Sequence, residues 1–156
     1  MIFYTTNSFR QAILSLTKRV KDGYSTVVED ICRALQDMPD NIIRDTNDRI
    51  IQQQNFRIVK LRLSNSEQRL AKANGFRLIY YVSLVDETAV LLYVYPKRGP
   101  QGVGNITDAE YNRLIGEMIQ ESANKTLHQV DVTDNLTELS TEFANKINNI
   151  HTLPLL

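Results

Sequence analysis

The sequence predicts a small α+β fold, in which an N-terminal helix hairpin packs on one face of a small antiparallel β-sheet and a helical extension follows. Three observations predict it. Two helical patterns precede residue 40, three strand-like segments with short links lie between residues 56 and 95, and a capping box begins another helix at residue 107. Of the 156 residues, 42% are hydrophobic, which is enough to bury a core.

The first 53 residues predict a strand, two helices and a loop. Residues 2–5 predict a short strand, after which Asn7 or Ser8 can cap a helix. The apolar residues of that helix recur at helical spacing, namely Phe9, Ala12, Ile13, Leu16 and Val20. A second helix over 24–38 ends at Pro39, and the polar residues 40–53 predict a loop.

The segment 75–82, Gly-Phe-Arg-Leu-Ile-Tyr-Tyr-Val, has the aromatic and aliphatic composition of a strand. Segments 56–63 and 89–95 have the same character, so the three predict an antiparallel meander. One face of this sheet is apolar enough to hold the helices. We expect the other face to expose Lys60, Arg62, Arg77, Tyr81, Tyr93 and Tyr95.

The C-terminal third predicts two more helices. Residues 96–105 are rich in Gly and Pro and predict a loop, and Thr107 with Glu110 forms the capping box of the next helix. A last amphipathic helix is predicted over 134–149 from Leu136, Leu139, Phe143 and Ile147. We therefore divide the chain into a domain of residues 1–120 and an extension of residues 121–156.

The net charge of zero hides an asymmetry between the two parts of the chain. Residues 1–100 hold 15 Lys and Arg against 10 Asp and Glu, whereas residues 101–156 hold 3 against 8. Cations can hold phosphates, and tyrosines can stack on bases or move protons. Two interpretations stay open: a polyanion-binding surface, or a solvated sheet face. The acidic extension can cover the basic face, dock elsewhere, or simply pack.

Several classes of site and location are not expected. The sequence has no P-loop, dinucleotide fingerprint, zinc-protease motif or nucleophile elbow, and its two histidines, His128 and His151, lie in the acidic tail, so we expect no metal and no cofactor. A single cysteine, Cys32, fits a reducing cytoplasm. No apolar run is long enough for a membrane span, and we expect a cytoplasmic protein.

Several segments resemble the RelE/ParE toxin superfamily of bacterial toxin–antitoxin modules. They are the short strand with its helix hairpin, Phe-Arg-Ile-Val-Lys-Leu-Arg-Leu at 56–63, Gly-Phe-Arg-Leu-Ile-Tyr-Tyr at 75–81, Leu-Leu-Tyr-Val-Tyr-Pro-Lys-Arg at 91–98 and Ile-Thr-Asp-Ala-Glu-Tyr at 106–111. The resemblance covers about residues 1–120. For RelE-like members it implies an mRNA interferase, which is a metal-independent endoribonuclease that acts on the ribosome and is neutralised by a cognate antitoxin protein.

The resemblance also implies site residues. In the implied reaction the ribose 2′-hydroxyl attacks the adjacent phosphate, and basic side chains hold and neutralise that phosphate. Arg77 would stabilise the charge of the transition state, while Lys60 and Arg62 would bind phosphate, with Lys60 a candidate proton acceptor. Tyr95 would stack on a base or assist proton transfer. The expected RNA-binding residues are Lys97, Arg98, Tyr81 and Arg57.

The chain also departs from the family pattern. RelE-type toxins are usually strongly basic, whereas this chain is neutral, and residues 121–156 have no counterpart in the minimal toxin. ParE-like members inhibit DNA gyrase and lack the nuclease residues. A ParE-like gyrase inhibitor and a catalytically inactive partner-binding member therefore remain alternatives.

Overall fold

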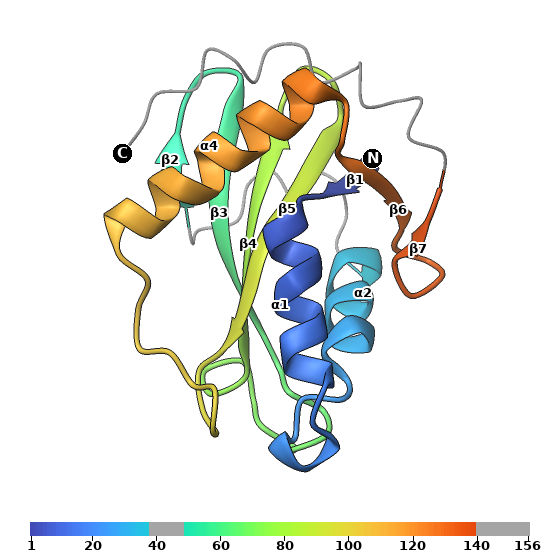
Figure 1. Ribbon diagram of the computed structural model, residues 1–156, viewed down its shortest axis with the longest axis vertical. Coiled ribbons are helices and arrows are strands. Elements are labelled where there is room, and N and C mark those ends of the chain that lie inside the picture. The colour runs from blue at the N-terminus through green and yellow to red at the C-terminus, as the bar shows by residue number, and fades with distance from the viewer. Residues whose placement is uncertain (38–48, 140–156) are drawn as a thin grey trace.

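The computed structural model describes residues 1–37 and 49–139, which form an α+β fold around one mostly antiparallel sheet (Figure 1). The strands are β1 (Ile2–Thr5), β2 (Arg49–Gln52), β3 (Phe56–Leu63), β4 (Phe76–Ser83), β5 (Thr88–Pro96), β6 (His128–Asp131) and β7 (Thr137–Glu138). The helices are α1 (Asn7–Thr17), the short 3₁₀ helix η1 (Val20–Asp22), α2 (Val27–Asp37) and α4 (Asp108–Asn124). The α+β class is confirmed, and the sheet is larger than the predicted meander.

The seven strands lie in the order β2-β3-β4-β5-β1-β6-β7. The predicted meander is present as β3, β4 and β5, each antiparallel to the next. The strand β1 pairs in parallel with residues 88–91 of β5, and β6 is antiparallel to β1. Because β6 and β7 extend the same sheet, the chain beyond residue 120 contributes to it, and residue 120 itself lies within α4.

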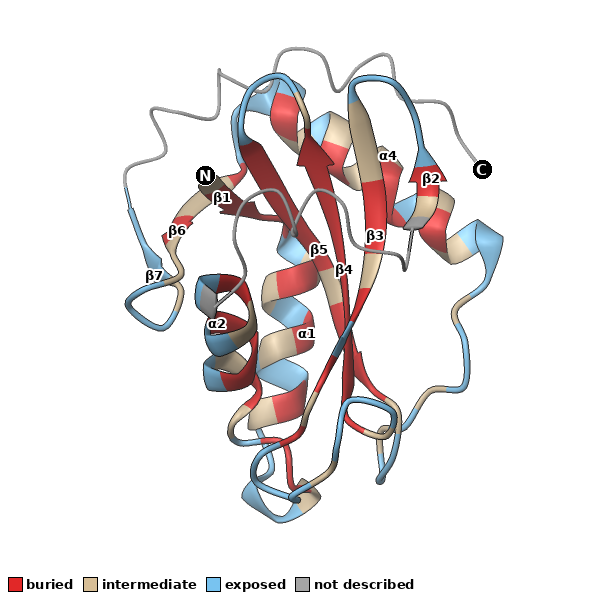
Figure 2. Ribbon diagram, turned by 180° about the vertical axis from the view of Figure 1, so that it is seen from behind, coloured by how far each residue is buried: buried red, intermediate tan, exposed pale blue. Residues whose placement is uncertain are grey.

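Helices α1 and α2 bury their apolar residues against one face of the sheet (Figures 1 and 2). Phe9 and Leu16 of α1 and Ile31 of α2 share a cluster with residues of β3, β4 and β5. The cap of α1 is Thr6, whose hydroxyl accepts the N–H of Phe9 at 3.2 Å, so the predicted caps were one or two residues late. The helix ends before Val20, which is 75% exposed and not part of the apolar stripe.

The opposite face of the sheet is not open, and the prediction that it exposes Tyr81, Tyr95 and Arg77 was wrong. Helix α4 packs Tyr111, Leu114, Ile115 and Met118 against this face. As a result Tyr81 and Tyr95 are buried, and every residue of β4 is buried (Figure 2). The predicted capping box is confirmed, because the Thr107 hydroxyl accepts the N–H of Glu110 at 3.2 Å.

A β-bulge interrupts the alternation of side chains along β5. Ile79 of β4 pairs with Tyr93, but the next residue, Tyr80, pairs with Leu91, so β5 holds one residue more than β4 at this point. The same hydrophobic cluster consequently contains Val90, Leu92 and Tyr95, although strict alternation along β5 would place Tyr95 opposite the other two. The bulge carries Tyr95 to the face of Arg77.

Helix α4 is attached to the start of α1 by two carboxylates. The backbone N–H of Asn7 donates to both oxygens of Glu121 at 3.1 and 3.2 Å, and that of Ser8 donates to Glu117 Oε1 at 2.7 Å. The Ser8 hydroxyl donates to the other oxygen of Glu117, and Arg10 Nη2 lies 3.6 Å from Glu121. These bonds satisfy the unpaired N–H groups of the α1 N-terminus and hold α4 across the sheet.

Two predictions about the segments outside the meander need correction. Residues 134–139, predicted as the start of a helix, form a turn and β7, and residues 140–149 lie outside the described residues. Of the predicted loop 40–53, residues 49–52 form β2, and residues 38–48 lie outside the described residues. In the described part of the chain, every helix is too short or too polar to cross a bilayer.

Candidate functional site

The strand register brings four of the predicted site residues together on the α4 face of the sheet. Arg62 of β3 lies directly opposite Arg77 of β4, and Arg77 lies opposite Tyr95 of β5. Lys60 is two residues before Arg62 on the same side of β3. We call Lys60, Arg62, Arg77 and Tyr95 the basic row.

Arg77 is fixed at the centre of the basic row. Its guanidinium donates to the backbone carbonyls of Lys72 and Ala73 at 2.9 Å and to that of Phe76 at 3.1 Å, and the residue is only 6% exposed. Charge-assisted bonds to three carbonyls offset the burial of the cation. Arg62 is opposite Arg77 in the strand register, and two like charges directly opposite in a sheet repel.

The other members of the row differ in how far they reach solvent. Arg62 is exposed and Lys60 is half-buried, whereas Tyr95 is 2% exposed. Burial raises the pKa of Tyr95 above the ordinary value of 10, and the nearby Arg77 charge partly opposes this. The Tyr95 hydroxyl is therefore protonated at neutral pH and can donate a proton but not accept one.

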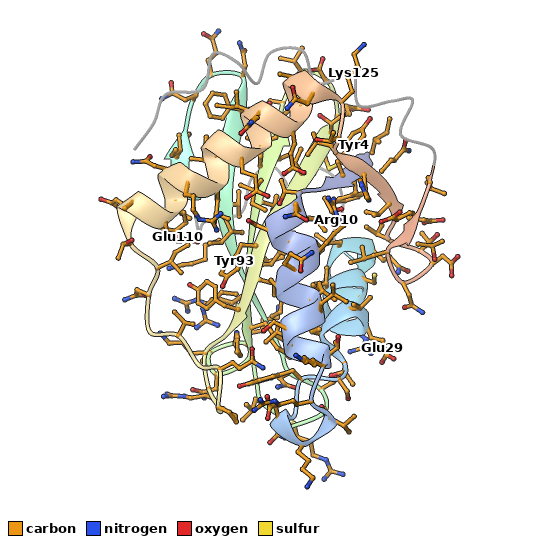
Figure 3. All side chains as sticks on the ribbon, in the orientation of Figure 1. Tyr4, Arg10, Glu29, Tyr93, Glu110 and Lys125 are labelled. Carbon is orange, nitrogen blue, oxygen red and sulfur yellow. The ribbon has the colours of Figure 1, made fainter. Side chains whose placement is uncertain are left out.

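Tyr93 lies beside the row and was not among the predicted site residues. Its ring centroid is 6.0 Å from that of Tyr95, and it is half-buried, so it is the more accessible of the two rings. Figure 3 shows Tyr93 in front of the sheet, below Glu110 at the start of α4. An aromatic residue close to cations was visible in the sequence. The bulge in β5 was not, so the sequence could not show that Tyr93 rather than Tyr95 stays accessible.

Lys97 and Arg98 follow β5 directly, but both side chains already have partners. Lys97 Nζ donates to the carbonyl of Gly104 at 2.6 Å, and Arg98 Nε donates to Asn74 Oδ1 at 3.0 Å. These bonds organise the loop after β5. Both residues lie near the Arg77 end of the sheet, since the backbone N–H of Lys97 donates to the carbonyl of Gly75.

Arg57 and Tyr81 are not part of the row. Arg57 lies on the α1 and α2 side of β3, in step with Val59, and its Nε and Nη1 atoms are buried with no hydrogen-bond partner in the structure as described. Tyr81 is four residues beyond Arg77 in β4, at the opposite end of the sheet. The row therefore contains all four predicted catalytic residues, but these two predicted RNA-binding residues lie elsewhere.

Two further cations lie close to the row's exposed end. A cavity of about 310 Å³ is lined by Arg62 and Lys72 together with Asp30 and Arg33 of α2. Lys72 was missed because it lies in the polar connection between β3 and β4, where nothing in the sequence distinguishes it. Within residues 1–37 and 49–139, no three or more His, Cys, Asp or Glu side chains are grouped so as to hold a metal ion.

No protein-family model, curated protein or solved structure matches this chain.

Proposed function

We propose that this chain is a toxin of the RelE-like kind, which cleaves mRNA on the ribosome without a metal ion and is neutralised in the cytoplasm by a cognate antitoxin protein. The observation that supports it is the basic row, in which two arginines, a lysine and a tyrosine occupy neighbouring positions on one sheet face. The order of elements supports it as well, because β1, α1 and α2 precede the meander as the resemblance implies. The RelE-like packing of the helix hairpin is part of the same proposal.

The chemistry follows from the charges in the row. The ribose 2′-oxygen forms a bond to the adjacent phosphorus as the bond from phosphorus to the 5′-oxygen breaks, which leaves a cyclic phosphate and a 5′-hydroxyl. Arg62 neutralises the phosphate, and the fixed charge of Arg77 stabilises the negative charge that develops, while Lys60 adds positive charge only once it has taken up the 2′-hydroxyl proton. Tyr95, protonated at neutral pH, donates the proton to the leaving oxygen. Lys60 is the candidate acceptor of the 2′-hydroxyl proton.

The experiment is induced expression combined with mRNA cleavage in a purified translation system. We expect growth arrest and cleaved mRNA, and we expect Arg62→Ala to reduce cleavage at least about 100-fold. The matched control is Arg19→Ala, which removes an exposed cation between α1 and η1, and it should cleave normally. Unchanged cleavage by Arg62→Ala would contradict the proposal.

A second candidate is a partner-binding member, such as a gyrase inhibitor, with no catalysis of its own. The burial of Arg77 and Tyr95 favours it, because side chains committed to the fold are less able to follow a reacting phosphate. A supercoiling assay with purified protein distinguishes the two: gyrase inhibition with intact mRNA supports this candidate. If neither target is affected, an inactive member that binds only a partner protein is the better description.

A further inference from the structure

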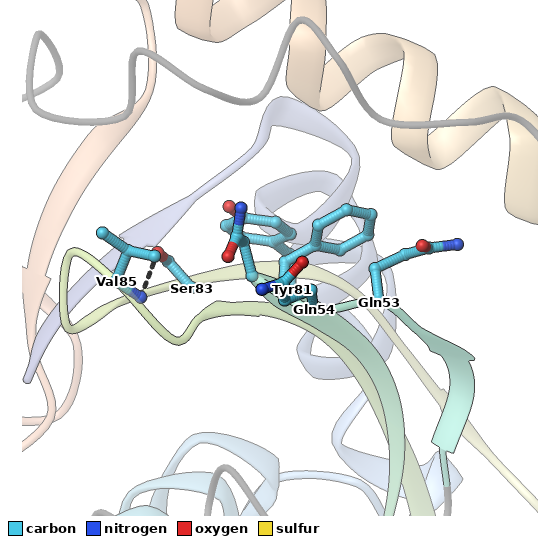
Figure 4. A pocket seen from close by; sticks show the side chains of 7 residues that line it. Gln53, Gln54, Tyr81, Ser83 and Val85 are labelled. Atoms are coloured by element: carbon cyan, nitrogen blue, oxygen red, sulfur yellow. Dashed lines mark hydrogen bonds between the residues drawn. The ribbon is translucent and has the colours of Figure 1, made fainter.

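We infer that a pocket at the far end of the α4 face from the basic row binds an unpaired purine base. Its volume is about 390 Å³, within the range that holds small ligands. It is lined by Gln53, Gln54, Asn55, Phe56, Tyr81, Ser83 and Val85 (Figure 4). The inference does not depend on strand cleavage, because it concerns base recognition at a separate place in the fold.

Two β-turns that lie side by side form the walls of this pocket. The turn between β2 and β3 is closed by a bond from Gln53 N to the Phe56 carbonyl at 3.0 Å, and the Leu84 N–H donates to the Asn55 carbonyl at 2.8 Å. Ser83 Oγ accepts the N–H groups of Val85 at 3.2 Å and of Asp86 at 3.0 Å. These bonds fix the backbone around the pocket before any ligand arrives, which lowers the entropic cost of binding.

The floor of the pocket is aromatic. The rings of Phe56 and Tyr81 lie 5.8 Å apart between centroids at an interplanar angle of 30°. Tyr81 is 3% exposed and firmly held, whereas Phe56 is half-buried and presents part of its ring to the pocket. A planar heterocycle stacks well on such a surface.

The rim of the pocket consists of carboxamides. Gln53, Gln54 and Asn55 are all exposed, and each amide both donates and accepts hydrogen bonds. Figure 4 shows Gln54 near Tyr81, whereas the Gln53 side chain lies at the edge of the group and extends outward. Carboxamides pair with the N6 and N7 atoms of adenine, which carry a donor and an acceptor side by side.

The lining is uncharged, which separates this site from the basic row. Burial raises the pKa of Tyr81 to about 12, so its hydroxyl is neutral at physiological pH, and no other lining residue is ionisable. A neutral, aromatic and amide-rich lining favours a base over a phosphate. The base can belong to an RNA strand or to a free nucleoside, which offer the same chemistry to this pocket.

The test uses the full chain with three probes: adenosine, ribose 5-phosphate and a short oligoadenylate. We expect adenosine to bind at millimolar concentration or below and to shift the NMR side-chain amide signals of Gln53, Gln54 and Asn55. Ribose 5-phosphate should leave those signals unchanged. Tighter binding of the oligoadenylate identifies the source as an RNA strand, and equal binding identifies it as a nucleoside.

Two variants keep the inference falsifiable. Replacing Gln53 and Gln54 by Ala together should weaken adenosine binding at least about tenfold, and Phe56→Leu, which keeps apolar volume but removes the ring, should weaken it too. The matched control, Gln120→Ala, removes an exposed amide from α4 and should bind adenosine normally. No adenosine binding, unchanged binding by both variants, or the same amide shifts with ribose 5-phosphate overturns the inference.

Adenosine binding without mRNA cleavage counts against the proposed function alone, and cleavage without adenosine binding counts against this inference alone.

Discussion

Glu121 makes the stability of this protein depend on pH in a direction that a single substitution can test. The carboxyl is mostly buried and shares a hydrogen bond with Glu117, and burial followed by that bond raises the pKa of Glu121 to about 7 from an ordinary 4.5. The folded state therefore holds the proton more tightly than the unfolded state does. Stability is present in full below about pH 4.5 and is lost as pH rises through about 7.

The size of the effect on the unfolding free energy follows from the difference between the two pKa values of Glu121. Moving one pKa from 4.5 to about 7 corresponds to about 3 kcal/mol of unfolding free energy. Burial alone would raise the pKa of Glu117, but bonds from Ser8 and the charge of Arg113 lower it below its ordinary value, which acts in the opposite sense. Arg10, 3.6 Å from Glu121, also favours the charged form. We expect a net loss of about 1 to 2 kcal/mol between about pH 5 and pH 8.

Glu121→Gln should remove this dependence. The amide oxygen can still accept the Asn7 N–H, and the amide can donate to Glu117 without ionising at any pH. The urea midpoint of the wild type should be lower at about pH 8 than at about pH 5, whereas that of the variant should be the same at both. At pH 8 the variant should therefore be the more stable protein. The control is Glu29→Gln, which neutralises an exposed carboxylate in the first turn of α2 and should keep the wild-type slope (Figure 3). A wild-type slope in Glu121→Gln would refute the reasoning.

Four further substitutions test the sheet and the helix α4 that covers it. Arg77→Ala should lower the unfolding free energy by about 1 to 3 kcal/mol, because three carbonyls lose their donor, and urea denaturation measures it. Gly75→Ala should cost at least about 2 kcal/mol, since its Cβ would lie 2.0 Å from the Leu63 carbonyl oxygen, whereas Gly116→Ala, with nothing within 4 Å, should stabilise α4 by about 1 kcal/mol in the same assay. Arg62→Glu should abolish mRNA cleavage if the proposed function holds, because it puts a negative charge where the phosphate would bind. Cleavage retained by Arg62→Glu would contradict the proposed role of the row.

The meander was predictable because its three segments combine strand composition with turn residues at their ends. The predicted strand 75–82 became Phe76–Ser83, a shift of one residue at each end. What the sequence did not reveal is that both faces of this strand are buried. Arg77 suggested an exposed face, but its long side chain reaches backbone carbonyls five and four residues earlier in the chain, so the charge is satisfied without solvent.

The contribution of the C-terminal region was not predictable from local patterns. The apolar stripe of α4 predicts that the helix packs, but not which face of the sheet it covers. β6 and β7 contain four and two residues, too few for a period of two to stand out. The bulge in β5 is a further case, since one extra residue reverses the face of every later side chain. Tyr95 lies on the face of Arg77, as expected from the sequence, only because of this bulge. Without the bulge, alternation from Val90 would put Val94 on that face and Tyr95 on the other.

The two arginines of the basic row are opposite each other in the sheet but are held differently. The guanidinium of Arg77 is buried and donates to backbone carbonyls, including those of Lys72 and Ala73. Arg62 is exposed and lines the cavity beside Asp30 and Arg33 of α2. In the proposed function a phosphate would be attracted by both charges, and only Arg62 can reach it from solvent. An Arg62 variant that cleaves mRNA as well as the wild type would therefore reduce the row to packing.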